Sequence, residues 1–132
     1  IIRAPKDALI NGMDVFSFAI TRPPKSMKEM LEEEKLDKDK DIDYFLIHQA
    51  NKLIVDRLVK KMKLDPQKVP YNLQEFGNLG GASIPMIMTS EIAEDLQNKP
   101  LTLMCSAFGL GLTWGTMVLK TKPMFVLPVN KI

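Results

Sequence analysis

The hydrophobic and polar positions along the chain predict strands that alternate with helices. The stretch DVFSFAI (residues 14–20) alternates large apolar with smaller side chains, which is typical of a strand with one deeply buried face. Ser26 and Glu29 have the spacing of a capping box, and the apolar positions around them predict a helix over residues 26–36. The short apolar run YFLI (residues 44–47) predicts a buried strand.

The second half of the chain continues this alternation. A helix is predicted from Asn51, because apolar side chains recur there at helical spacing with charged ones opposite. After the glycine-rich loop GNLGGASIP, Ser83 is expected to cap a third helix, with Pro85 in its first turn and an end before Asn98. LTLMCSA and LTWGTMVLK predict two strands joined by the tight FGLG, as an antiparallel hairpin. The order of elements indicates an α/β fold with a mixed sheet.

Composition narrows the class of protein. The chain of 132 residues is 45% apolar and 26% charged, as in soluble globular domains, and its formal charge of +2 gives no case for nucleic acid. No apolar run approaches the roughly 20 residues that cross a bilayer, and the first residues lack the layout of a signal peptide. Cys105 is the only cysteine, which excludes an internal disulfide and a cysteine-rich metal site. We expect a cytoplasmic protein that binds neither nucleic acid nor membrane.

Two uncharged hydrogen-bond donors stand where the predicted elements turn. His48, the only histidine, ends a predicted strand, and Asn78 lies in the glycine-rich loop thirty residues later. The carboxyl ends of strands in open α/β sheets form the crevice where ligands bind. A neutral imidazole and a carboxamide suit an oxygen that gains negative charge, such as a thioester oxygen becoming an enolate, and the FGLG turn can add backbone N–H groups.

Each of these residues also has a purely structural interpretation. His48 could be a hydrogen-bonded residue at a strand end, and Asn78 a turn residue in a left-handed conformation. Cys105 has apolar neighbours on both sides, which favours a buried and inert thiol. Ser83 lacks the G-x-S-x-G elbow of a hydrolase. The lysines and arginine of the helix after Asn51 could be no more than a solvated face.

Three motifs occur in order, HQAN, GNLGGASIP and AFGLGLTWG, with about thirty residues between successive ones. Together they resemble the C-terminal half of a β-ketoacyl-[acyl carrier protein] synthase III, a member of the thiolase superfamily, and the likeness runs from about Gly12 to Lys120. It implies that residues 1–132 are the C-terminal catalytic domain, a thiolase-like half-domain that forms one half of a five-layered αβαβα sandwich. It also implies that the nucleophilic cysteine belongs to an N-terminal half that this sequence lacks.

The resemblance implies roles for individual residues. His48 and Asn78 resemble the catalytic pair that holds a thioester carbonyl while malonate loses carbon dioxide. Phe108 resembles the phenylalanine placed over the nucleophile, and Leu110 stands where a backbone N–H completes the oxyanion hole, although glycine is usual there. The positions that match the pantetheine tunnel are Gly12, Phe16, Ala50, Asn51 and Ile54. The cations expected to dock the acidic carrier protein are Lys52, Arg57 and Lys61.

The function implied is a decarboxylative Claisen condensation of acyl-CoA with malonyl-[acyl carrier protein], which initiates fatty acid synthesis. We expect this acyltransferase activity from the complete protein and not from this chain alone. No cofactor and no metal is expected besides the substrates, and the partners implied are acyl carrier protein, the N-terminal half and a second subunit in a homodimer. The alternatives are another thiolase-superfamily acyltransferase, of polyketide, alkylquinolone or 3-hydroxy-3-methylglutaryl-CoA synthase type, or a non-catalytic module that docks carrier protein.

Overall fold

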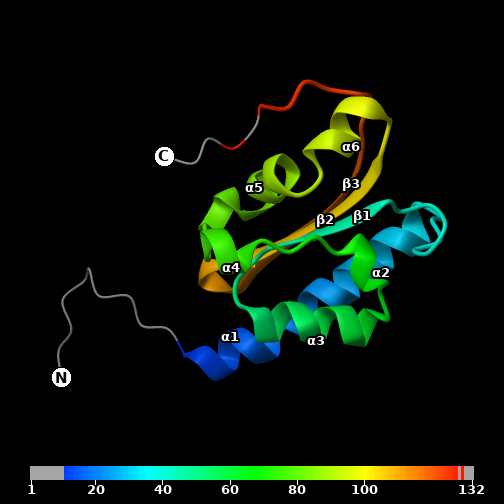
Figure 1. Ribbon diagram of the computed structural model, residues 1–132. Coiled ribbons are helices and arrows are strands. Elements are labelled where there is room, and N and C mark those ends of the chain that lie inside the picture. Colours follow the sequence, from blue (N-terminus) through cyan, green and yellow to red (C-terminus); the bar gives the residue numbers. More distant parts are fainter. Residues whose placement is uncertain (1–10, 128, 130–132) are drawn as a thin grey trace.

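The computed structural model describes residues 11–127 and 129. A three-stranded mixed sheet in the order β1-β2-β3 runs through the molecule (Figure 1). Its strands are β1 (Tyr44–Ile47), β2 (Thr102–Gly109) and β3 (Thr113–Lys120). β1 pairs with β2 in parallel, and β2 pairs with β3 in an antiparallel ladder from Thr102↔Lys120 to Gly109↔Thr113. The predicted α/β class, mixed sheet and antiparallel hairpin are confirmed.

Helices cover both faces of the sheet. In Figure 1, α1 to α3 lie on one side of it, and α5 and α6 lie on the other. Successive residues of a strand point to opposite faces, so Phe45 and Ile47 pack with the first group of helices while Leu46 packs with the second. The helices are α1 (Gly12–Ala19), α2 (Arg22–Glu33), α3 (Lys52–Met62), α4 (Leu73–Phe76), α5 (Ser83–Ser90) and α6 (Ala93–Asn98).

The prediction of a strand over DVFSFAI is wrong, because most of this stretch forms α1. The side-chain oxygen of Asn11 caps the helix by accepting hydrogen bonds from the backbone N–H groups of Met13 and Asp14, at 3.1 and 3.5 Å. Val15, Phe18 and Ala19 have the spacing of one helix face, so the stretch fits both periods and the cap decides between them.

Two predicted helix starts also differ from the structure. α2 begins at Arg22 rather than at Ser26, because Pro23 and Pro24 are well suited to a first helical turn. α5 begins at Ser83, yet its hydroxyl does not cap the helix and lies buried without a hydrogen-bond partner among the described residues. The third predicted helix is divided, since α5 ends at Ser90 and α6 follows.

The helix predicted from Asn51 is confirmed as α3, with the Asn51 side chain accepting a hydrogen bond from the Ile54 N–H at 2.9 Å. Across residues 11–127 and 129, no helix is both long and apolar enough to span a bilayer. The same residues contain no cluster of three or more histidine, cysteine or acidic side chains able to hold a metal ion.

Candidate active site

A cleft of about 870 Å³ opens at the end of the sheet where the parallel strands β1 and β2 both finish. Its walls come from four segments that are far apart in the sequence: α1, the residues after β1, the glycine-rich loop before α5, and the turn between β2 and β3. This is the edge at which open α/β sheets place their ligands. His48, Ala50, Asn78 and Phe108 all line the cleft, so four of the predicted site residues are brought together.

His48 is held at the end of β1 by the sheet itself. Its backbone N–H donates to the carbonyl of Ser106 at 2.9 Å, which extends the parallel pairing by one residue. The imidazole stands edge-on to the Phe108 ring, with centroids 5.1 Å apart and planes at 87°. The residue is only 8% exposed, and this burial lowers the pKa of His48 from its ordinary value of 6.5. The ring is therefore neutral at pH 7 and can donate one hydrogen bond.

Asn78 is oriented by a turn of the glycine-rich loop. Its side-chain oxygen accepts a hydrogen bond from the Gly80 N–H at 2.9 Å. The positive φ angles of this turn belong to Gly77 (67°) and Gly80 (56°), so Asn78 is not the left-handed turn residue of the structural interpretation. Because the oxygen is engaged, the N–H₂ group is the part of the carboxamide that is left to donate to a ligand.

The turn between β2 and β3 closes one side of the cleft. Phe108 is 7% exposed and lies beside His48, whereas its predicted place over a nucleophile stays a prediction. Leu110 begins a short 3₁₀ turn, and its neighbours Gly109 and Gly111 line the cleft. Leu112 adopts a positive φ of 53°, which is uncommon for a residue other than glycine. The backbone of this turn therefore borders the same cleft as His48 and Asn78.

Only one of the five positions assigned to a pantetheine tunnel lines the cleft, and that position is Ala50. Asn51 caps α3, Ile54 is 2% exposed within the core, and Phe16 packs against the same core cluster. Gly12 is exposed at the start of α1. A tunnel formed by the five residues stays a prediction.

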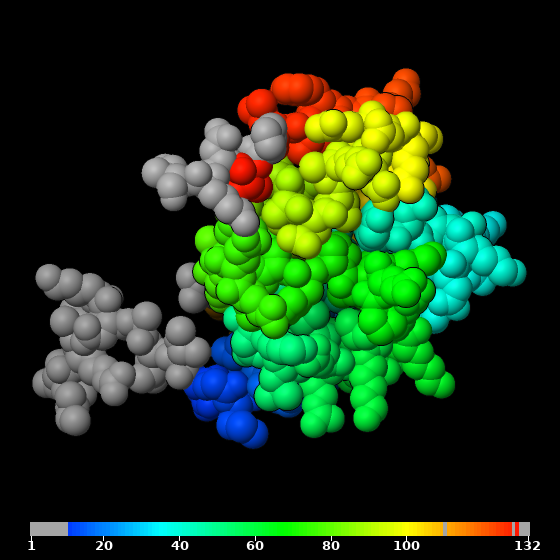
Figure 2. Space-filling view, viewed as in Figure 1, coloured from blue at the N-terminus to red at the C-terminus, as the bar shows by residue number. Residues whose placement is uncertain are grey.

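The three cations assigned to carrier-protein docking differ in what holds them. α3, which carries them, lies on the molecular surface with side chains projecting outward (Figure 2). The Lys52 ammonium pairs with Asp56 at 2.9 Å, and the Lys61 ammonium donates to the carbonyl of Ile20 at 2.6 Å. Arg57 is exposed, and none of the ion pairs found among the described residues includes it. Arg57 is thus the most available of the three cations for an ion pair with a partner.

The thiol of Cys105 lies away from this cleft. It is 3% exposed in β2 and packs in the cluster formed with α5 and α6, on the other face of the sheet from Phe108. Burial raises the pKa of the Cys105 thiol to about 11. The prediction of a buried thiol is confirmed, and its high pKa makes it a poor nucleophile at neutral pH.

Sequence reasoning missed several residues that line the cleft. Asn11 and Asp14 enter it from α1, where the Asn11 amide donates to the Asp14 carboxylate at 2.7 Å. Trp114 enters from β3. The N-cap signal at Asn11 could have located the first pair, whereas no local pattern indicates that the Trp114 ring meets α1.

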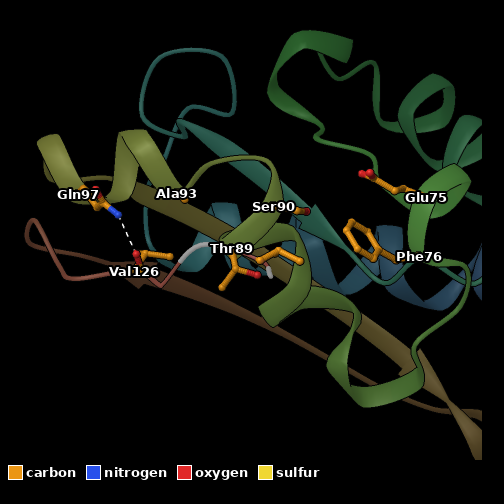
Figure 3. A pocket seen from close by; sticks show the side chains of 8 residues that line it. Glu75, Phe76, Thr89, Ser90, Ala93, Gln97 and Val126 are labelled. Carbon is orange, nitrogen blue, oxygen red and sulfur yellow. Dashed lines mark hydrogen bonds between the residues drawn. The ribbon is translucent and has the colours of Figure 1, made fainter. Parts of the chain in front are cut away.

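A second cavity of about 470 Å³ contains none of the predicted site residues. It lies between α4, α5–α6 and the C-terminal segment, with Phe76, Thr89 and Val126 among its lining (Figure 3). The Gln97 amide donates to the Val126 carbonyl at 2.8 Å, and the Met124 N–H donates to the Leu96 carbonyl at 2.9 Å. The segment after β3 therefore packs along α6 as part of the fold.

Comparisons with known proteins show which family the chain belongs to. Residues 31–121 match the family described as 3-oxoacyl-[acyl-carrier-protein (ACP)] synthase III C terminal. The chain is 39% identical over 112 residues to β-ketoacyl-[acyl-carrier-protein] synthase III of Streptococcus pneumoniae (strain Hungary19A-6), covering 83% of this chain and 34% of that protein. The chain thus spans about a third of the length of the curated relatives it matches.

Two solved structures with the same fold are also synthases. The 3-oxoacyl-(acyl-carrier protein) synthase of Burkholderia xenovorans LB400 superposes with a TM-score of 0.89 and 33% identity, over 96% of this chain and 36% of that one. The β-ketoacyl-[acyl carrier protein] synthase III of Thermus thermophilus gives a TM-score of 0.79 and 29% identity, over 92% of this chain and 40% of that one. The thiolase-like α/β fold is therefore confirmed, and the chain belongs to the C-terminal domain family of 3-oxoacyl-[acyl-carrier-protein] synthase III.

Proposed function

We propose that this chain supplies the decarboxylating part of a ketoacyl synthase III active site. The observation that carries the proposal is that His48 and Asn78, two uncharged donors thirty residues apart, line one cleft together with Phe108. Neither side chain is a strong nucleophile, but together they can hold an oxygen on which negative charge develops. The substrate class that needs this is a malonyl thioester.

In the proposed step bonds break and form only in the substrates, and no group of this chain is transferred. The bond between the malonyl carboxylate and the methylene carbon breaks, carbon dioxide departs, and the electron pair becomes the enolate of the remaining thioester. The imidazole N–H of His48 and the carboxamide N–H₂ of Asn78 donate to the enolate oxygen. The enolate carbon then attacks an acyl thioester, and the thiolate of that thioester leaves.

The acyl group in this scheme is held elsewhere. Cys105 is buried on the opposite face of the sheet, and no other cysteine occurs in the chain. We propose that the nucleophilic cysteine belongs to a further part of the complete synthase, in line with relatives of which the match covers only 34%. Acyl carrier protein as the malonyl donor, docking on α3, and assembly as a homodimer are parts of the same proposal.

The test is a replacement of His48 by alanine in the complete synthase that carries this sequence. We expect the release of carbon dioxide from malonyl-carrier protein to fall about 10²- to 10³-fold, the usual effect of removing one donor to a developing oxyanion. Acylation of the catalytic cysteine by acyl-CoA should stay near the wild-type rate. Y44F is the matched control, because Tyr44 lies at the far end of β1 and bonds to Asp95. Undiminished decarboxylation by H48A would contradict the proposal.

The same assay separates the related acyltransferases. A fatty acid synthase component should prefer malonyl-carrier protein, whereas a polyketide or alkylquinolone-type synthase should accept malonyl-CoA, and a 3-hydroxy-3-methylglutaryl-CoA synthase should condense acetyl-CoA without decarboxylation. A docking module alone would bind carrier protein with a strong dependence on salt and would give identical results for H48A and wild type in every reaction.

A further inference from the structure

Two aromatic rings from different elements form part of the wall of the cleft. Phe18 of α1 and Trp114 of β3 both line it, and their ring centroids lie 5.6 Å apart with planes at 70°, an edge-to-face contact. Trp114 is 46% exposed, so its ring is reachable from solvent. Val15 and Leu112 line the same cleft. This wall suits a ligand segment of methylene and amide groups better than a charged one.

Arg22 holds the Trp114 ring from a third element. It is the first residue of α2, and its guanidinium carbon lies 5.8 Å from the centre of the indole, within the range of cation–π attraction. The ion pairs found across residues 11–127 and 129 are formed by lysines and do not include Arg22. The indole is therefore the partner that the structure records for this charge.

The link between α1 and α2 fixes Phe18 and Arg22 relative to each other. The Thr21 hydroxyl donates to the carbonyl of Ser17 at 2.7 Å and to that of Phe18 at 3.2 Å. The Lys61 ammonium, from α3, donates to the Ile20 carbonyl at 2.6 Å. Phe18 and Arg22 thus contact the Trp114 ring from one hydrogen-bonded junction. Phe18 lies in the wall of the cleft, whereas Arg22 lies outside it.

We propose that Arg22 is a positioning residue for substrate binding, because it holds the Trp114 ring against Phe18 and so forms the wall along which the uncharged arm of a thioester lies. The arm is the chain of amide and methylene groups that joins the thioester to its carrier. Its identity rests on the proposed function, whereas the Arg22–Trp114–Phe18 arrangement does not. His48 and Asn78 hold the reacting oxygen, and this wall binds the part of the substrate that does not react.

The experiment uses Trp114 as its own reporter, because it is the only tryptophan of the chain. The variants are R22M, which removes the charge but keeps a long side chain, and R22K, which keeps the charge. K25M is the matched control, since Lys25 lies one turn further along α2 and pairs with Glu29 instead. Acrylamide quenching of the fluorescence measures the exposure of the indole, and titration with acetyl-pantetheine or with the shorter acetyl-N-acetylcysteamine measures binding.

We expect quenching to rise in R22M and to stay near the wild-type value in R22K and K25M. The dissociation constant for acetyl-pantetheine should rise about two- to five-fold in R22M, the range given by an exposed cation–π contact, while that for the short thioester stays unchanged. In the complete synthase R22M should raise the KM for the thioester substrate and leave kcat unchanged. A merely structural role would affect both thioesters equally.

Three results would overturn the inference. These are unchanged quenching in R22M, unchanged binding of acetyl-pantetheine in a variant whose quenching rises, and no saturable binding of acetyl-pantetheine by the wild-type chain. Failure here is distinguishable from failure of the proposed function, because acetyl-pantetheine has no carboxylate to lose and reports on the arm alone. Loss of decarboxylation in H48A would still support the proposed function if R22M bound like the wild type.

Discussion

Replacing Asn78 by aspartate separates what its two side-chain atoms do. The oxygen accepts a hydrogen bond from the Gly80 N–H at 2.9 Å, which holds the turn, and the N–H₂ group is left for the substrate. An aspartate keeps an oxygen in place for the turn but has no N–H to donate. It also puts a negative charge beside the substrate oxygen on which negative charge develops.

The expected magnitudes follow from these two functions. Loss of one donor to an oxyanion reduces the rate about 10²- to 10³-fold, which corresponds to about 3 to 4 kcal/mol, and the added charge reduces it further. The fold should be little affected, because the bond to Gly80 survives. In N78A that bond is lost as well, at a cost of about 0.5 to 1.5 kcal/mol, so its melting temperature should fall by a few degrees below that of N78D.

The assay pairs carbon dioxide release from malonyl-carrier protein, measured in the complete synthase, with thermal melting of the same variants. We expect N78D to melt like the wild type and to decarboxylate at the level of N78A or lower. N78D activity within a few-fold of the wild type would refute the reasoning, since it would show that the carboxamide N–H₂ is not a donor in the reaction. Melting of N78D below N78A would refute the role assigned to the oxygen.

The remaining predictions concern titration, reactivity and docking. Burial lowers the pKa of His48 below its ordinary 6.5, so as the pH falls the unfolded chain binds a proton before the folded chain does. The melting temperature should therefore fall as the pH drops through 6.5 in wild type but not in H48Q. The hydrogen bond to Asp95, at 2.5 Å, together with burial raises the pKa of Tyr44 to about 12. The stability that this bond contributes should therefore be lost between pH 10 and 12, and urea denaturation of Y44F should lack this loss. The pKa of Cys105 is raised to about 11, so the intact mass of the chain should be unchanged after incubation with acetyl-CoA. An adduct on this thiol would disprove the assignment of the nucleophile to another part of the synthase. R57E should weaken carrier-protein binding several-fold at low salt, whereas K61M should chiefly lower the melting temperature. A larger loss of carrier-protein affinity in K61M than in R57E would contradict the docking surface.

The three strands and helix α3 could be predicted from sequence because local signals agree there. β1 is a short apolar run, and α3 has both an apolar stripe and a capping side chain at Asn51. In α1 the signals conflict, since Val15, Phe18 and Ala19 satisfy a helix while the neighbouring side chains alternate as in a strand. The decisive feature is the Asn11 cap, which lies just before the apolar run.

The candidate site was predictable to the extent that topology alone determines it. His48 follows β1 and Phe108 is the next-to-last residue of β2, and two adjacent parallel strands must finish at the same edge. The contacts of Trp114 with Phe18 and Arg22 depend on how two helices cross a strand about ninety residues later, which no local period encodes. Ser83 shows the converse, because a residue with good capping chemistry was left with a buried hydroxyl that has no partner among the described residues.

The state of the two donors indicates which chemistry the cleft favours. A general base works best with a pKa near the pH at which it operates, but burial against Phe108 lowers the pKa of His48 and keeps the ring a neutral donor. The carboxylate that lines the cleft belongs to Asp14, and the Asn11 amide holds it at 2.7 Å. A site that forms an enolate by proton removal needs a base aimed at the substrate carbon, whereas one that forms it by loss of carbon dioxide needs only donors for the oxygen. Neutral His48 and the fixed amide of Asn78 meet the second requirement, which supports the proposed loss of carbon dioxide over deprotonation as the route to the enolate.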